Sequence, residues 1–278
     1  VKPKAPFNFD ATVHKPSHFP APMDDYQQGM YWCTLRISDK VLGLKMTNSG
    51  SIDAPLLSLK FFSEKPLSQK ERDNIVNEVS WRFEFDTDLS EFCEKFKRDE
   101  ILGPVLVKWR GMRMGSCGSL YDLLVISIVL QNATVRRTVQ MMEALLERYG
   151  TKVRFDGKEL YALWEPKRLH RTSEQELREL KVGYRAKYLK KTSEDFVKGV
   201  VDEFKLRQMT MEEAKKELDK LYGVGPASAS ILLSEALHHY DTIEKIGWWE
   251  QQIYSRLLFN RELVPAETII KEINKRYG

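Results

Sequence analysis

The segment that most constrains this chain is Leu221–Ala229, LYGVGPASA, which stands between two stretches of helical pattern. A capping box that starts at Thr210 begins the upstream helix, and Pro226 suits the first turn of the downstream one. Gly223 and Gly225 let a short turn adopt positive φ angles and approach a partner closely. The pattern predicts two helices joined by a turn whose free N–H groups bind an anion, most simply a phosphate. An ordinary helix–helix connector is the alternative interpretation.

The composition indicates a globular protein that can bury a core. Of the 278 residues, 42% are hydrophobic and 30% are charged, and the net charge of +4 is compatible with nucleic acid without requiring it. The longest apolar stretch, residues 123–130, is too short to span a bilayer, and residues 1–30 lack the apolar core of a secretory signal. Three widely spaced cysteines predict neither a disulfide framework nor a thiolate metal cluster. We therefore expect an intracellular protein of the cytoplasm or nucleoid, without membrane contact.

The chain changes character near residue 87. Short β-favouring runs at 31–37 and 40–46, joined by a Ser-Asp turn, predict a hairpin, and residues 56–62 predict a further strand before a helix at 70–82. Beyond residue 88 the pattern is almost wholly helical. The expected fold is α+β, with a small N-terminal mixed β-sheet domain at 1–87 followed by an all-α domain at 88–278 that contains the glycine turn. Its predicted helices include 120–131, 134–149 with Gly150 after its end, 173–183, 185–199 and 265–277.

Three segments together resemble the helix–hairpin–helix (HhH-GPD) DNA glycosylase superfamily. The glycine turn is the hairpin. Residues 180–188, LKVGYRAKY, are similar to a Gly-Tyr-Arg segment of the 8-oxoguanine branch, and residues 129–134, VLQNAT, stand where the family carries its Gln/Asn-rich helix junction. The strand-rich N-terminus resembles the β domain of the 8-oxoguanine and 3-methyladenine branches. This resemblance covers nearly the whole chain and implies a monomer whose partner is double-stranded DNA with a damaged base.

The resemblance also implies which side chains hold DNA once a nucleotide has been flipped out. Asn132, Tyr184 and Arg185 match residues that contact the unpaired partner base, and Gln131 lies beside them with a second amide. Tyr184 would wedge between bases, while Arg185 would donate to the widowed base or to phosphate. A helix cap for Asn132 and a core aromatic position for Tyr184 are the structural alternatives.

The hairpin departs from the family pattern at one position. Gly223, Val224, Gly225 and Ala227 are expected to hold a phosphate, chiefly through the N–H groups of the glycines and of Ala227. Bifunctional members carry a lysine nucleophile two residues after the second glycine, where this chain has Ala227. The implied enzyme is therefore a hydrolase without lyase activity, with water as the nucleophile. No metal site or cofactor is predicted, apart from a structural monovalent or divalent cation that the family would place at the hairpin.

A second departure concerns the catalytic carboxylate. The family places an aspartate on the loop beyond the hairpin, and counted without gaps this position falls at Ile246 or Gly247. Glu250, which opens the next helix, is the nearest carboxylate after a shift, and Asp241 on the loop is the alternative. A carboxylate at a helix N-terminus stays ionised at neutral pH. The same dipole effect makes a plain helix-start residue the structural alternative for Glu250.

Aromatic and basic residues complete the expected site. Trp248, Trp249 and Tyr222 offer flat faces on which an electron-poor base stacks, with core packing as the alternative. Basic residues at 108–113, 136–137 and 181–191 fit a DNA track. The motifs together imply a monofunctional DNA glycosylase of base excision repair that flips an alkylated or oxidised purine and hydrolyses its N-glycosidic bond. A non-catalytic DNA- or lesion-binding protein on the same fold is the alternative.

Overall fold

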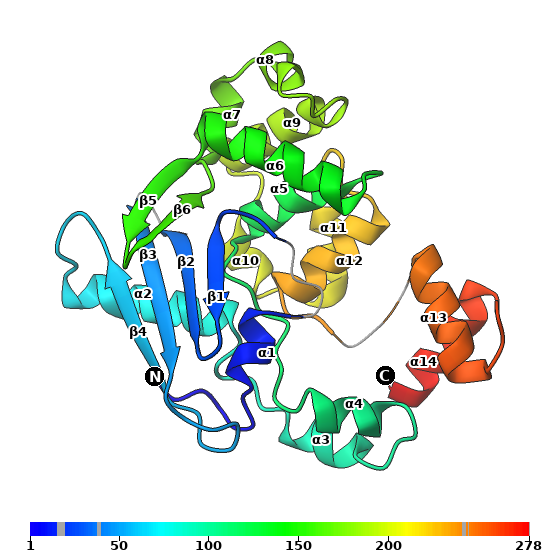
Figure 1. The fold of residues 1–278 in the computed structure, drawn as a ribbon. Helices are drawn as coiled ribbons and strands as arrows, with labels where there is room; N and C mark the ends of the chain where they lie inside the picture. The colour runs from blue at the N-terminus through cyan, green and yellow to red at the C-terminus, as the bar shows by residue number, and fades with distance from the viewer. Residues whose placement is uncertain (16–19, 38–39, 241–242, 244, 278) are drawn as a thin grey trace.

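The structure is a computed structural model that describes residues 1–15, 20–37, 40–240, 243 and 245–277. An antiparallel sheet formed by the N-terminal part is followed by a mostly helical region, which confirms the α+β class (Figure 1). Among the described residues, no helix is long and apolar enough to cross a membrane.

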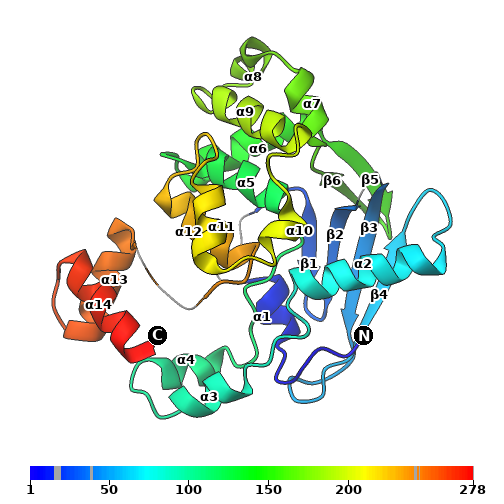
Figure 2. The ribbon, with the colours of Figure 1, turned by 180° about the vertical axis from the view of Figure 1, so that it is seen from behind.

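Four strands form the sheet of the N-terminal body, in the order β1-β2-β3-β4. The predicted pairing of 31–37 with 40–46 is confirmed, and its turn, Ser38-Asp39, lies outside the described residues. Cys33 and Leu44 pair across the sheet and are fully buried, because α2 covers this face with Ile75 and Val79 (Figure 2). The elements of this body are α1 (Phe9–Val13), β1 (Asp24–Gln27), β2 (Met30–Ile37), β3 (Lys40–Asn48), β4 (Leu57–Phe62) and α2 (Gln69–Arg82).

A separate hairpin interrupts the region expected to be almost wholly helical, so that expectation is wrong for residues 151–162. Strands β5 (Thr151–Phe155) and β6 (Lys158–Ala162) are joined by Asp156-Gly157, both with positive φ. Asp-Gly between alternating residues is a strong hairpin signal. Phe155 and Leu160 pack with Trp32 of β2 in a separate small cluster, so the hairpin covers the sheet face opposite to α2.

The largest core belongs to the helices between residues 120 and 235. Helix α5 is buried on nearly all sides and contacts α6, α9 and α12, as its continuous apolar pattern predicts. Gly150 follows α6 as expected, and its backbone is extended, with a φ of −67° and a ψ of 165°. The helices are α5 (Leu120–Leu130), α6 (Val135–Tyr149), α7 (Pro166–Arg171), α8 (Glu174–Glu179), α9 (Arg185–Val197), α10 (Glu203–Leu206), α11 (Met211–Leu218) and α12 (Pro226–Glu235).

The two ends of the helical region lie side by side in a smaller lobe (Figures 1 and 2). The ring of Tyr277 packs edge-on against Phe96 with 5.5 Å between centroids, and its hydroxyl donates to Asp99 at 3.1 Å. The helices that the structure describes beyond residue 88 thus belong to two bodies. The lobe consists of α3 (Ser90–Phe96), α4 (Leu102–Lys108), α13 (Trp248–Phe259) and α14 (Ala266–Tyr277).

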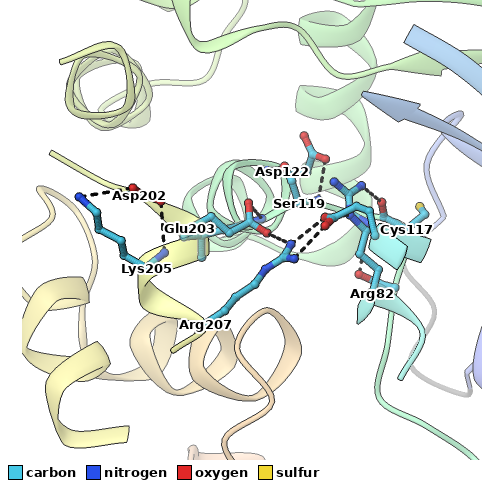
Figure 3. Close-up of polar contacts among 12 residues, drawn as sticks. Arg82, Cys117, Ser119, Asp122, Asp202, Glu203, Lys205 and Arg207 are labelled. Carbon is cyan, nitrogen blue, oxygen red and sulfur yellow. Dashed lines mark hydrogen bonds and ion pairs between the residues drawn. The ribbon is translucent and has the colours of Figure 1, made fainter. Parts of the chain in front are cut away.

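A buried set of charged side chains, which we call the α2–α10 ion cluster, joins the N-terminal body to the larger helical body (Figure 3). It consists of Glu78 and Arg82 on α2, Glu203 on α10 and Arg207 directly after α10. Arg207 donates to Glu78 at 2.7 and 2.8 Å and also to Glu203, while Arg82 donates to Glu78 at 2.7 Å. Glu203 in turn accepts the N–H of Leu120 at 3.1 Å, so the cluster reaches the first residue of α5.

Candidate nucleic-acid interface and base cavity

The loop between α11 and α12 presents unpaired backbone N–H groups. Those of Gly223, Gly225 and Ala227 find no acceptor in the described part of the chain, whereas Val224 donates to the carbonyl of Leu221 at 3.1 Å. Gly223 has a φ of +89°, but Gly225 has a φ of −97°, and a Cβ there would meet nothing within 4 Å. The protein itself therefore does not require glycine at 225. The open space in front of this residue leaves room for a partner's close approach.

A row of aromatic rings supports the hairpin from α9. A Cβ on Gly223 would lie 2.7 Å from the ring of Tyr188, which also packs edge-on against Tyr222 and Tyr184 at 5.3 and 5.5 Å between centroids. The ammonium of Lys187 lies 5.0 Å from the centroid of Tyr222, whose hydroxyl raises the pKa of Lys187. The lysine therefore stays charged beside the hairpin. Tyr188 was not among the predicted site residues, although it lies within the LKVGYRAKY segment.

The predicted base-contacting residues meet at the junction between α5 and α6. Gln131 donates its side-chain amide to the carbonyl of Gly223 at 2.6 Å. The carbonyl of Gln131 accepts both the hydroxyl of Tyr184, at 3.3 Å, and the guanidinium of Arg185. Asn132 has a φ of +48° and donates to the Tyr184 hydroxyl at 3.2 Å. The tertiary structure thus brings these four residues together against the hairpin.

Within this group, exposure divides the residues into two pairs. Asn132 and Tyr184 are exposed, with 40% of Tyr184 accessible. Arg185 is only 8% exposed and lies 4.8 Å from the Tyr184 ring centroid. Asn132 and Tyr184 are therefore free to contact a partner, whereas Gln131 and Arg185 hold them in place with hydrogen bonds to the backbone.

The expected catalytic carboxylate lies elsewhere, in the first turn of α13. The carboxylate of Glu250 accepts the N–H of Gly247 and so forms half of a capping box, which is the structural alternative for this residue. Trp248 and Trp249 precede it and are 59% and 75% exposed. Asp241, the alternative catalytic residue, lies outside the described residues.

The three aromatic residues expected to form one base pocket belong to two different bodies. Trp248 and Trp249 lie on the smaller lobe, whereas Tyr222 lies in the hairpin and packs on Tyr188. Between the tryptophans and Tyr222 there is no ring contact in the part of the chain that the structure describes. The geometry therefore does not assemble a pocket from these three side chains.

A cavity of about 240 Å³ lies instead between the N-terminal body and helices α5 and α12. Its position links it to the hairpin, because α12 begins at the hairpin and Leu130 of the cavity wall directly precedes Gln131. The wall combines segments far apart in the sequence, and its most characteristic members are Met23, Tyr31, Phe83, Leu123, Ser127, Leu130, Ile231 and Glu235. One feature of the sequence could have pointed to this cavity. Glu235 is the only charged residue of the otherwise apolar or small-residue helix α12.

The basic residues are not all available for a DNA track. Arg113 is 2% exposed and donates to the carbonyls of Thr87 and Gly111 at 2.8 and 3.1 Å, so its assignment to the track is wrong. Arg110 forms an exposed ion pair with Asp53. The basic segments that adjoin the hairpin and junction are 136–137 and 181–191.

The model of the HhH-GPD superfamily, described as base excision DNA repair proteins, matches residues 125–278, which are more than half of the chain. The chain belongs to this superfamily. The HhH-GPD chain is 25% identical over 214 residues to the DNA-3-methyladenine glycosylase of Bacillus subtilis, which covers 76% of the chain and 69% of the relative. It is also 24% identical over 191 residues to a probable N-glycosylase/DNA lyase of Methanothermobacter thermautotrophicus, which covers 61% of the chain and 60% of the relative.

Solved structures share the fold of this HhH-GPD protein. The 3-methyladenine DNA-glycosylase of Archaeoglobus fulgidus matches with a TM-score of 0.80 at 17% identity, over 100% of this chain and 92% of the other. The 8-oxoguanine glycosylase/lyase of Clostridium acetobutylicum, in complex with double-stranded DNA that contains cytosine opposite 8-oxoguanine, matches with a TM-score of 0.73 at 21% identity, over 99% and 87%. The fold is therefore shared with a 3-methyladenine DNA-glycosylase and with an 8-oxoguanine glycosylase/lyase.

A hairpin cation, which the superfamily implies, would depend on backbone carbonyls, since no cluster of His, Cys, Asp or Glu among the described residues could hold a metal ion. The carbonyl of Gly223 already accepts from Gln131, and that of Leu221 from Val224. The cation stays a prediction, and no step of the proposed reaction uses it.

The two hairpin glycines are expected to respond differently to alanine. Gly223→Ala would place a methyl group against Tyr188 at a φ of +89°, so we expect a loss of about 1–3 kcal/mol of unfolding free energy. Gly225→Ala should leave stability unchanged but weaken binding to duplex DNA roughly tenfold, because the methyl group stands where a phosphate approaches. Thermal unfolding and fluorescence anisotropy measure the two effects. Unchanged DNA affinity of Gly225→Ala would contradict a phosphate site at this turn.

Proposed function

We propose that this HhH-GPD protein is a monofunctional DNA glycosylase that flips a damaged purine out of double-stranded DNA and hydrolyses its N-glycosidic bond. The observation that carries the proposal is the adjacency of three features. Unpaired N–H groups line the hairpin, Asn132 and Tyr184 are exposed beside it, and the wall of a cavity includes Leu130 at the end of α5. The glycosylase names of the relatives support this proposal.

Each feature has a task in base flipping. The N–H groups of Gly223, Gly225 and Ala227 hold a phosphate and so position the duplex without reading its sequence. Tyr184 fills the gap that the extruded base leaves, and the Asn132 amide hydrogen-bonds the orphaned partner. The extruded base enters the cavity between the N-terminal body and helices α5 and α12, whose wall is largely apolar.

Hydrolysis rather than lyase chemistry follows from the hairpin. A Schiff base requires a primary amine, and α12 contains no lysine. Water therefore attacks C1′ of the sugar, and the damaged base leaves with the bonding electrons. We assign to Glu250 the task of accepting the water proton and stabilising the positive sugar. It is exposed, lies at a helix N-terminus, and is the first carboxylate after α12 among the described residues.

The proposed activity is tested with duplexes that contain 3-methyladenine, hypoxanthine or 8-oxoguanine. We expect at least one duplex to acquire abasic sites that break only after alkali treatment. Borohydride should trap no covalent complex, because no Schiff base forms. Binding to DNA without base release from any of the duplexes would overturn the enzyme assignment.

A non-catalytic lesion-binding protein is the second candidate. Gly247 at the position where the superfamily places its aspartate favours it, as does the engagement of the Glu250 carboxylate with the Gly247 N–H. This candidate predicts that a lesion duplex binds more tightly than an undamaged one and stays intact.

A further inference from the structure

The cavity wall contains three carboxylates, and two of them have partners within the protein. Asp24 accepts the hydroxyl of Tyr31 at 2.7 Å. Asp122 accepts the backbone N–H of Ser119 at 2.8 Å and so caps α5. Glu235 makes no hydrogen bond or ion pair with any residue that the structure describes.

Helix geometry directs Glu235 into the cavity. It lies four residues after Ile231 on α12, so the two side chains share one face of the helix, and both line the wall. Other residues of the wall are apolar or aromatic, among them Phe83 and Leu123. The ammonium of Lys15 also reaches the cavity but donates to the carbonyl of Met114. A carboxylate without a partner in such surroundings favours a ligand that brings a donor or a positive charge.

We propose that Glu235 selects the base: its carboxylate receives the positive charge and the N–H groups of the flipped purine, so the cavity prefers a cationic, N-alkylated purine to a neutral, oxidised one. This inference rests on the proposed function, because the hairpin must deliver the base to the cavity. Alkylation of a ring nitrogen leaves a purine in DNA positively charged, and the half-buried carboxylate of Glu235 attracts that charge.

Single-turnover base release tests this selection. The substrates are duplexes with 7-methylguanine, which is cationic, and with hypoxanthine or 8-oxoguanine, which are neutral. We expect Glu235→Gln to lower release of 7-methylguanine roughly 10- to 100-fold relative to the neutral bases. Glu147→Gln, on the exposed face of α6, is the matched control and should change neither rate. Equal effects on cationic and neutral bases, or no effect, would overturn the proposal.

A binding measurement separates this proposal from the proposed function. A fluorine at the 2′ position of the damaged nucleotide slows glycosidic cleavage, so affinity can be measured whether or not the protein is an enzyme. The wild type should bind the 7-methylguanine duplex roughly tenfold more tightly than the guanine duplex, and Glu235→Gln should lose that preference. If the wild type releases no base but shows this preference, only the enzyme assignment fails. If Glu235→Gln folds normally and keeps the preference, the role of Glu235 is wrong.

Discussion

We expect Glu250→Gln to lower the single-turnover rate constant of base release by roughly 100- to 10,000-fold, the usual range for a lost general acid or base. The substitution removes the negative charge but keeps the shape of the side chain. Glutamine also serves at the third position of a capping box, so α13 should keep its first turn. Rapid-quench measurement of abasic sites gives the rate, and DNA affinity should stay within a factor of about two.

The matched control is Glu176→Gln, which changes the same position of the capping box of α8, on the larger helical body. It should leave the rate constant unchanged. An unchanged rate for Glu250→Gln, in a folded protein, would remove Glu250 from the reaction. Asp241 would then be the next carboxylate to replace.

Glu78→Gln should lower the free energy of unfolding by about 3–5 kcal/mol, because it leaves two buried guanidinium groups without their shared carboxylate. The side chains of Glu78, Arg82 and Arg207 are between 6% and 10% exposed, so water replaces little of the lost interaction. Urea unfolding at neutral pH measures the change. The control is Glu174→Gln, whose exposed pair with Arg178 should contribute less than about 1 kcal/mol. If Glu78→Gln loses as little unfolding free energy as Glu174→Gln, the α2–α10 ion cluster is not a major stabilising contact.

Glu78 also predicts how the free energy of unfolding depends on pH. Burial by itself would raise the pKa of Glu78, but Arg207 and Arg82 outweigh it and lower the pKa to about 2, from a usual value of about 4.5. A carboxyl with a depressed pKa in the folded state stabilises the protein fully above its unfolded pKa and progressively less as pH falls towards the folded one. The stability difference between the wild type and Glu78→Gln should therefore shrink as pH falls from 4.5 to 2. A difference that stays constant over this window would contradict the ion-pair account.

Local signals in the sequence were sufficient for much of the fold. Capping boxes at Thr210 and Ser173 begin helices where the structure has them, because the reciprocal side-chain and backbone hydrogen bonds involve only neighbouring residues. The continuous apolar run of α5 predicts its central position, since a helix without a polar face must be covered on all sides. The β5–β6 hairpin was not predicted, although its Asp156-Gly157 turn is a local signal. Its two strands are only five residues long and stand between helices α6 and α7.

For the candidate site too, some features could be predicted from the sequence and others only from the tertiary structure. The LYGVGPASA segment was enough to predict a turn with free N–H groups, since glycine conformation and helix ends depend on adjacent residues. Only the tertiary structure showed that Gln131 donates to the hairpin and Arg185 to the carbonyl of Gln131, while Asn132 and Tyr184 are exposed. Which side chain is buried depends on packing between helices that are distant in the chain.

The base cavity required the folded chain. Its wall is built from the β-sheet body, α5 and α12, and no spacing in the sequence records how these surfaces meet. The separation of Trp248 and Trp249 from Tyr222 was equally hidden, because α13 packs with α14 in another body than the hairpin. Chain-local geometry thus sufficed for the turn with free N–H groups. The position of Glu235 in the cavity depends instead on how α12 packs against α5 and the N-terminal body, which are distant from it in the chain.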